Sequence, residues 1–148
     1  AKLPAFIAKI GLFEIEKWEQ TKHTRIRIFK KYKSLFEEFG FSEYLPKAYN
    51  DTGIQIVPLR FVLSHPDANN IKNLFKLYLD IESTWFMAPI IVCSEPSELG
   101  YRYGSCNQAE LFGERALNFP CALNNIDANR LIKLLTETLT NQKNVNKI

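Results

Sequence analysis

The sequence predicts an α/β domain of the α+β type, in which short strands are set among more numerous helices. Segments with the three- and four-residue apolar spacing of helices are separated by short strand-like segments, in the order helix, helix, strand, helix, strand, loop, helix, short strand, helix. At 148 residues and 46% hydrophobic composition, the chain can bury about 70% of its unfolded surface around one core. No internal repeat or break in composition indicates a second independent domain.

The first part of the chain is predicted to be helical. Pro4 is tolerated in the first turn of a helix from Leu3 to Ile10, and Gly11 indicates a bend before a longer helix. That longer helix should end near Phe39, where Gly40 supplies the left-handed residue that terminates it. Its apolar residues recur at three- and four-residue steps, which predicts one core-facing seam. The seam consists of Ile26, Phe29, Tyr32, Phe36 and Phe39.

The same helix is strongly basic, in a chain with a net charge of +3 and a pI near 8.7. From Lys22 to Lys33 it carries seven basic groups, counting His23, and no acid. Such a helix could lie along nucleic-acid phosphates. However, Glu37 and Glu38 follow directly, and the cations fall mostly on the side opposite the seam. We therefore favour a solvated helix face over a face that binds nucleic acid, a partner or a substrate.

The segment from Ile54 to Leu63 is the clearest strand, and its apolar pattern changes phase. Ile54 and Ile56 occupy even positions, whereas Leu59, Phe61 and Leu63 occupy odd ones. A bulge or break at Val57–Pro58 would return both sets to the core face, so we expect all five side chains to point mostly inward. Pro58 cannot donate to a ladder, which is typical of an edge or bulged position.

Two later helices are indicated by the residues of their first turns. Pro66 and Asp67 begin one of them, and Asn125 and Asp127 begin the last. The tail beyond Thr140 is polar and has no periodic pattern, so it should be frayed. The predicted buried faces are Ile71, Leu74, Phe75 and Tyr78 in the first of these helices, and Ala128, Leu131, Ile132, Leu135 and Leu139 in the last.

Nothing in the sequence indicates a self-contained catalytic site. His23 lies in the basic helix and His65 at a helix start, and the sequence has no GxSxG, HExxH, CxxC or Gly-rich phosphate motif. Cys93, Cys106 and Cys121 lack metal-ligand spacing and are interpreted as buried, reduced thiols of a cytoplasmic protein. No run of 18 apolar residues and no signal-peptide pattern is present, so we predict no membrane span.

The last third of the chain carries an ordered series of motifs. They are Tyr101-Arg102, a short helix from Gln108 to Arg115, a strand from Leu117 to Pro120, and a helix opened by Asn125-Ile126-Asp127. In order and spacing this series resembles the C-terminal end of the DegT/StrS-like family, the pyridoxal-phosphate-dependent aminotransferases that act on nucleotide-linked keto-sugars. The resemblance covers nearly the whole chain. It includes Pro58-Leu59-Arg60-Phe61, similar to the family's first small-domain strand, and Ala8, Gly11, Leu12, Arg25 and Tyr32, spaced as in its inter-domain helices.

The resemblance implies a fold and a division of the chain. It implies a small, mainly antiparallel sheet flanked by helices, as in the C-terminal domain of fold-type I aminotransferases. Residues 1–39 would be inter-domain helices that pack on the small domain, residues 40–140 the small domain, and residues 141–148 a frayed tail. Two departures from the family pattern, at Asp80-Ile81 and at 88–91, remove the usual Gly and His and weaken any specific substrate assignment.

The resemblance also implies a function for the intact protein. An amino group would pass from an amino acid such as glutamate to a nucleotide-linked keto-sugar, with pyridoxal phosphate held by an upstream large domain. This chain alone would bind no cofactor and catalyse nothing, because it lacks the family's Schiff-base lysine; Lys72, Lys76 and Lys133 fall on polar sides of their helices. Its partners would be the large domain, a second subunit of a homodimer and the sugar nucleotide, with no nucleic acid and no membrane.

Three residues are candidates for contact with substrate, namely Arg60, Trp85 and Arg102. Guanidinium groups suit phosphate or carboxylate recognition, and an indole suits stacking on a sugar or base. The simpler alternatives are a core position for Trp85 and surface or interface ion pairs for each arginine. Two other interpretations of the chain stay open. One is a stand-alone, non-catalytic interaction module with this fold, and the other is an unrelated α/β domain whose terminal motifs match by chance.

The first helices carry more apolar residues than a single core-facing stripe uses. We expect the excess to face the large domain or a second subunit, and the isolated chain to self-associate, because large apolar patches are rarely left bare. The residues concerned are Leu3, Phe6, Ile7, Ile10, Leu12, Phe13, Ile15 and Trp18.

Overall fold

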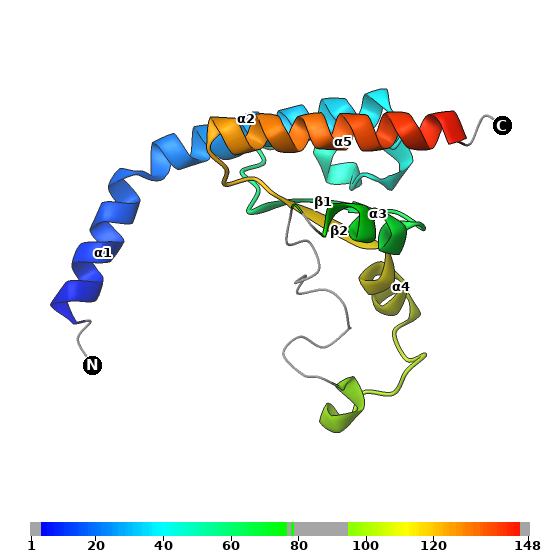
Figure 1. Cartoon of the computed structure of the whole chain (residues 1–148). Helices are drawn as coiled ribbons and strands as arrows, with labels where there is room; N and C mark the ends of the chain where they lie inside the picture. The colour runs from blue at the N-terminus through cyan, green and yellow to red at the C-terminus, as the bar shows by residue number, and fades with distance from the viewer. Residues whose placement is uncertain (1–3, 77, 79–94, 146–148) are drawn as a thin grey trace.

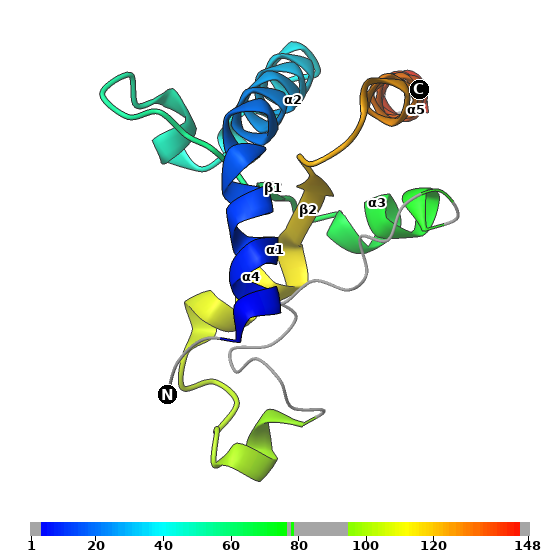
Figure 2. The ribbon, with the colours of Figure 1, turned by 90° about the vertical axis from the view of Figure 1, so that its left-hand side faces the viewer.

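The structure, a computed structural model, describes residues 4–76, 78 and 95–145. Within these residues it confirms the α+β class, with helices around a small antiparallel sheet. Helices α2 and α5 lie on one side of the sheet, and α1 projects away from the body (Figures 1 and 2). The elements are α1 (Ala5–Glu16), α2 (Trp18–Glu38), η1 (Ser42–Tyr44), η2 (Lys47–Asn50), β1 (Arg60–Ser64), α3 (Ala68–Phe75), η3 (Pro96–Leu99), α4 (Asn107–Arg115), β2 (Ala116–Pro120) and α5 (Asn125–Val145).

The sheet pairs β1 with β2 in antiparallel register, from Arg60 opposite Pro120 to Ser64 opposite Ala116. Because successive side chains of a strand point to opposite faces, Phe61 and Leu63 share a face with their cross-strand partners. All four of these side chains are fully buried, the partners being Phe119 and Leu117.

Helix α2 closes the core over this face of the sheet. The ring of Phe36 stacks on that of Phe61, with 5.5 Å between centroids and an interplanar angle of 10°. Tyr32 lies 5.3 Å from Phe61 and 5.8 Å from Phe119, measured between ring centroids. The predicted seam of α2 is confirmed at Phe29, Tyr32 and Phe36, but Ile28 and Leu35 are also buried, and Ile26 and Phe39 are only partly so.

The end of α2 follows the prediction. Gly40 has φ +84°, in the left-handed region that a Cβ disfavours. The Gly40 N–H donates to the Glu37 carbonyl at 3.0 Å, and the Phe41 N–H donates to the Phe36 carbonyl at 2.8 Å. This pair of hydrogen bonds is a Schellman motif, and its usual apolar contact is present because the rings of Phe36 and Phe41 lie 5.8 Å apart.

The start of α5 differs from the prediction by one residue. Asn124, not Asn125, is the cap: its Oδ1 accepts the Asp127 N–H at 2.8 Å, and its Nδ2 donates to the Asp127 carboxylate at 2.6 Å. The buried stripe is confirmed, with Ile132 only partly buried; its buried members are Ala128, Leu131, Leu135 and Leu139. The prediction of a tail frayed from residue 141 is wrong as far as residue 145, because α5 continues to Val145.

The predicted strand from Ile54 is too long. Only Arg60–Ser64 forms β1, and Ile54 and Leu59 are 52% and 62% exposed. The physical reason is the length of the partner strand, because β2 has five residues and offers no ladder bonds beyond Pro120. Pro58 lies outside the ladder and is buried, so the expected interruption near it is in fact the start of the strand.

The buried face of helix α3 is narrower than predicted. Ile71 and Phe75 are buried, but Leu74 and Tyr78 are 48% and 68% exposed. Lys72, expected on a polar side, is instead 7% exposed. An eight-residue helix presents only two turns to the core, so a face of four apolar residues is wider than the contact it can make.

Helix α1 continues through Gly11, so the predicted bend at that glycine is wrong. The break falls at Lys17, a single turn residue between α1 and α2 whose N–H still bonds the Phe13 carbonyl at 3.3 Å. None of the residues of α1 is buried. The helix therefore extends from the body without a covering layer among the described residues (Figure 1).

His65 links the end of β1 to the start of α3, as the sequence indicated. Its N–H donates to the Arg115 carbonyl at 2.9 Å, and its Nδ1 accepts the Asp67 N–H at 3.0 Å. The imidazole packs against Tyr44 and Phe41, at 4.4 and 5.0 Å between centroids. Burial lowers the pKa of His65 below its usual value, against the weaker opposite effects of Asp67 and Glu43.

We expect Gly40→Ala to lower the free energy of unfolding by roughly 1–2 kcal/mol, because a Cβ is strained in the left-handed region. No atom lies within 4 Å of the added Cβ, so the effect would come from the backbone angle alone. Gly11→Ala is the matched control, because Gly11 is helical and equally open. Urea unfolding of both variants is the measurement, and equal destabilisation by the two changes would contradict the assignment.

Stability should also depend on His65. Because the pKa of His65 is lowered in the folded state, the unfolded chain binds this proton first as the pH falls. The full free energy of unfolding should be present above about pH 7 and decline as the pH falls through about 6.5, the unfolded pKa. His65→Asn keeps an acceptor for the Asp67 N–H and should flatten this part of the profile. An unchanged slope between about pH 5.5 and 7 in that variant would contradict the expectation.

Candidate functional site

The structure places two of the three predicted substrate residues. Arg60 is exposed at the first position of β1, opposite Pro120. Arg102 is exposed in the loop before α4, and α4 joins the sheet at Ala116, the other end of the ladder. Trp85 lies outside the described residues. The two arginines therefore occur on segments attached to opposite ends of the sheet, and no hydrogen bond or ion pair among the described residues joins them into one site.

A polar cluster lies at the Arg60 end of the ladder, under α2. The half-buried Arg25 donates from a terminal nitrogen to the Pro58 carbonyl at 3.2 Å. The Tyr32 hydroxyl donates to the Pro120 carbonyl at 3.0 Å. These two bonds satisfy carbonyls at the edges of the ladder, where no strand partner remains. Cys121, the next residue, is fully buried.

The buried groups of this cluster are held neutral. Burial raises the pKa of the Cys121 thiol to about 12, although the positive charges of Arg25 and Arg60 oppose that rise. Burial likewise raises the pKa of the Tyr32 hydroxyl, helped by Cys121 and opposed by Arg60. A thiol that keeps its proton at neutral pH is a poor nucleophile. The cluster is thus suited to holding the sheet end, and its chemistry is not that of a cysteine nucleophile.

The role of Arg25 is one that sequence reasoning missed. The basic segment was interpreted as a solvated face, yet Arg25 points to the sheet, and its buried Nε has no hydrogen-bond partner among the described residues. A signal was available, because Arg25 lies one helical turn before Phe29 on the buried seam.

Other cations of α2 hold α5 beside it. Arg27 donates to the Asn125 side chain, and Lys31 donates to the Asn129 side chain at 3.0 Å. Two more make ion pairs along α2 itself, Lys22 with Glu19 at 3.6 Å and Lys33 with Glu37 at 3.4 Å. Much of the basic face is therefore already engaged within the domain, which weakens the nucleic-acid alternative further.

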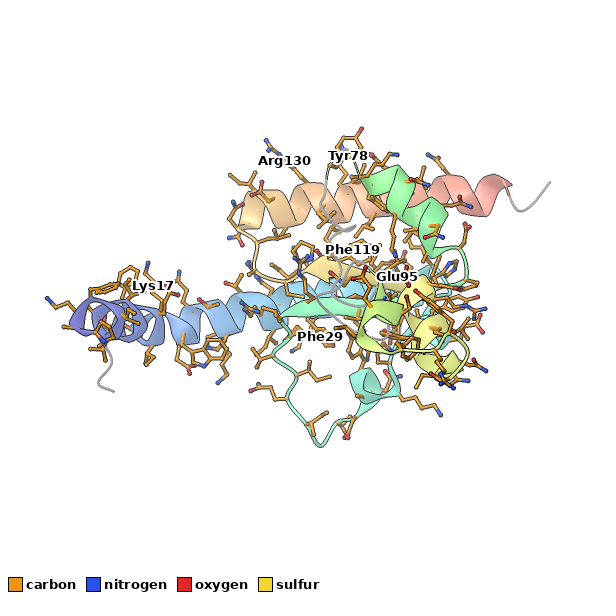
Figure 3. The ribbon with its side chains drawn as sticks, turned by 90° about the horizontal axis from the view of Figure 1, so that it is seen from below. Lys17, Phe29, Tyr78, Glu95, Phe119 and Arg130 are labelled. Carbon is orange, nitrogen blue, oxygen red and sulfur yellow. The ribbon has the colours of Figure 1, made fainter. Side chains whose placement is uncertain are left out.

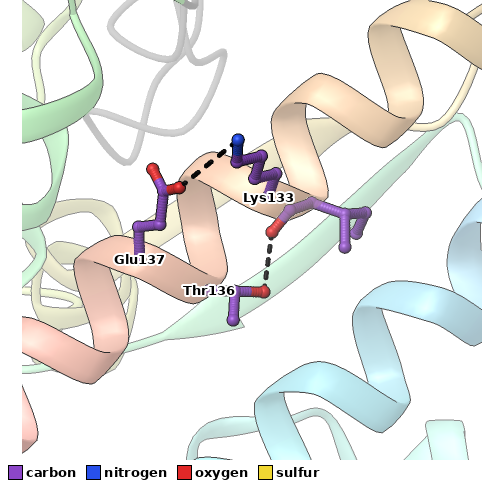
Figure 4. A network of polar contacts seen from close by, with 4 residues as sticks. Lys133, Thr136 and Glu137 are labelled. Atoms are coloured by element: carbon purple, nitrogen blue, oxygen red, sulfur yellow. Dashed lines mark hydrogen bonds and ion pairs between the residues drawn. The ribbon is translucent and has the colours of Figure 1, made fainter.

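An open cleft of about 600 Å³ runs along α5 and the side chain of Tyr78. Figure 3 shows Tyr78 and Arg130 on the same side of the molecule. The charged residues of its wall are balanced, Asp127 and Glu137 against Arg130 and Lys133. The Lys133 Nζ and the Glu137 Oε1 lie 3.8 Å apart; Figure 4 draws this ion pair as a dashed line. A wall of mixed sign offers no selective recognition of an anion or of a cation.

The loop that carries Arg102 is ordered by Glu110 of α4. The Glu110 carboxylate accepts the Tyr101 hydroxyl at 2.5 Å and the Gly104 N–H at 2.7 Å. Gly104 has φ +86°, a backbone angle that favours glycine. The rings of Tyr101 and Tyr103 meet edge to face with 5.7 Å between centroids. These contacts fix the loop and leave Arg102 exposed beside it.

The most extensive exposed apolar surface among the described residues is that of α1 and the start of α2. The predicted excess of apolar residues is found exposed, apart from Leu3, which lies outside the described residues. Lys17 covers one ring, with its Nζ 3.7 Å from the centroid of Phe13. The exposed fractions are 66% for Phe6, 42% for Ile7, 59% for Ile10, 60% for Leu12, 51% for Phe13, 70% for Ile15 and 46% for Trp18.

The described residues contain no cluster of three or more His, Cys, Asp or Glu side chains that could hold a metal ion. None of the described helices combines the length and apolar character that crossing a membrane requires.

No protein-family model and no curated protein matches the chain. The exposed apolar surface of α1 is the principal candidate for an interaction site within the described part of the chain.

The two described cysteines should differ in reactivity. The prediction of buried thiols is confirmed for Cys121 and wrong for Cys106, which is exposed at the start of α4; Cys93 lies outside the described residues. In a Cys93→Ser background at neutral pH, iodoacetamide should alkylate Cys106 about a hundredfold or more faster than Cys121. Peptide mass spectrometry after timed quenching measures both rates. Equal rates in the folded chain would contradict this, and equal rates in denaturant are the control.

Proposed function

We propose that this chain is the C-terminal small domain of a pyridoxal-phosphate-dependent aminotransferase-like protein that acts on a nucleotide-linked keto-sugar. In the intact protein the amino group of an amino acid such as glutamate would be exchanged for the keto oxygen of the sugar. The small domain would form one wall of the substrate cleft and dock against the large domain. It would not catalyse the reaction by itself.

The observation that carries this proposal is the exposed helix α1. A helix that is apolar on nearly all sides is usually buried. Here the helix is exposed and leads directly into α2, whose seam forms the core of the domain. Such an arrangement is expected of a helix that joins this domain to another body. The described elements α1, α2, β1, α3, α4, β2 and α5 follow one another in the order that the sequence predicts, and the further strand predicted between α3 and α4 lies outside the described residues.

Two exposed arginines are available for the substrate. Arg60 and Arg102 have no ion-pair partner among the described residues, and guanidinium groups bind phosphate and carboxylate oxygens in a bidentate manner. In the intact protein one of them could contact the diphosphate of a sugar nucleotide. Arg60 lies on β1 and Arg102 in the loop before α4, so both would serve one ligand only if that ligand reaches from the sheet to this loop.

The described residues do not fit a pyridoxal phosphate site. An aldimine lysine needs a desolvated amine that faces a cavity. The one described lysine that is buried, Lys72, does not line the 600 Å³ cleft, and this residue is not without a partner. We therefore assign the cofactor to the upstream domain and derive no chemical step from residues of this chain.

The proposal is tested on the native protein, isolated with an antibody raised against this chain. We expect a polypeptide longer than 148 residues in which borohydride fixes pyridoxal phosphate to one lysine upstream of Ala1. With glutamate and a nucleotide-linked keto-sugar, it should release a 2-oxo acid. The 148-residue chain, incubated with the cofactor and reduced in the same way, is the control and should carry no stoichiometric adduct.

Two outcomes would contradict the proposal. An adduct at a lysine of this chain would make it a cofactor-binding protein in its own right. A native polypeptide without cofactor and without amino transfer would favour the stand-alone interaction module, for which the exposed surface of α1 is the supporting observation.

A further inference from the structure

Helix α1 has two apolar faces on opposite sides, so a single flat partner surface covers only one of them. At 100° per residue, Phe6, Ile10 and Phe13 fall on one side of the helix, here called the Phe face. Leu12 and Ile15 fall on the opposite side. Phe6 and Phe13 are 66% and 51% exposed, and Leu12 and Ile15 are 60% and 70% exposed, so both faces offer apolar surface. Lys17 lies at the C-terminal end of the Phe face, with its Nζ 3.7 Å from the centroid of the Phe13 ring. If the side of Leu12 docks on a large domain, the Phe face still requires a partner.

Two charges border the Phe face on the same flank. Lys9 and Glu16 are two helical turns apart and therefore lie one above the other. Neither makes an ion pair with a described residue. The opposite flank of the Phe face carries Glu14. One flank is thus positive at its N-terminal end and negative at its C-terminal end.

We infer that the Phe face pairs with the Phe face of a second copy of this chain, with the two α1 helices antiparallel about a two-fold axis. In such a pair each flank meets the same flank of the other copy. Lys9 then lies opposite Glu16 of the second copy, and Glu16 opposite its Lys9. The axis that brings these charges together passes between Ile10 and Phe13, so the apolar and ionic contacts share one register.

The position of the folded body favours the antiparallel arrangement. The body follows the C-terminal end of α1, and the helix projects from it (Figures 1 and 2). A parallel pair would place two bodies at the same end of a two-helix stem, whereas an antiparallel pair places them at opposite ends. The two flanks of α1 carry different charges, with Lys9 and Glu16 on one flank and Glu14 on the other. An antiparallel pair brings each flank against the same flank of the other copy, whereas a parallel pair brings unlike flanks together, so charge substitutions distinguish the two arrangements.

The inference does not depend on the proposed enzymatic function. It is tested by sedimentation of the 148-residue chain over a series of concentrations. The wild-type chain should form dimers. Lys9→Glu and Glu16→Lys should each weaken dimerisation by about tenfold or more, because each places two like-charged pairs across the interface. Glu14→Lys is the matched control: it makes the same change of charge on the other flank and should not weaken an antiparallel pair.

The deciding measurement is a mixture of the Lys9→Glu and Glu16→Lys chains. Two chains of the same variant repel each other, but one chain of each variant restores both opposite-charge pairs. The heterodimer should therefore be more abundant than either homodimer. Ile10→Asn should abolish association and Leu12→Asn should not, with far-UV circular dichroism showing that each variant keeps its helices.

Three results would overturn the inference. One is a wild-type chain that stays monomeric throughout the concentration series. Another is undiminished dimerisation of Glu16→Lys, which would indicate a parallel or non-specific contact. The third is a mixture that associates no more strongly than its components.

Discussion

The fold depends on one contact, the packing of the aromatic seam of α2 over the two-stranded sheet. A two-stranded ribbon is marginally stable in water without a covering layer. Here Phe36 stacks on Phe61, and the Tyr32 ring contacts both Phe61 and Phe119. The Tyr32 hydroxyl also donates a hydrogen bond to the Pro120 carbonyl. Rings in contact add stabilisation beyond the area they bury. The same few side chains therefore hold the strands to each other and to the helix.

Helix α2 also determines where the candidate interaction surface lies. On its sheet side Arg25 binds the Pro58 carbonyl, and on its outer side Arg27 and Lys31 bind side chains of α5. These contacts orient α2 over the sheet and beside α5. Since α1 is joined to α2 by the single turn residue Lys17, the direction in which α1 leaves the body is inherited from α2. Cations that looked like a solvated face thus have a structural role.

Sequence alone predicted features whose causes are local and missed those set by distant partners. The end of α2 at Gly40 follows from one left-handed residue, and the exposed apolar surface of α1 follows from counting side chains around a helix. The strand from Ile54 was overextended because its length depends on β2, some 50 residues away. The cap of α5 was misplaced between Asn124 and Asn125 because both residue types suit it, and only the reciprocal bonds with Asp127 decide. Of the candidate site, Arg60 and Arg102 are exposed, and their contact with a substrate stays a prediction. Their positions, on the first residue of β1 and in the loop before α4, are a consequence of topology.

The exposure of α1 has a consequence for how it binds. An isolated helix of 12 residues is marginal in water, and a central glycine such as Gly11 costs it about 1 kcal/mol relative to alanine. Helix α1 gains little from the body, because none of its residues is buried there. Its helical order must then be stabilised mainly by whatever covers its apolar faces, so ordering and association are coupled. Part of the free energy of association is spent on ordering the helix, which keeps the contact weaker than its apolar area alone would suggest.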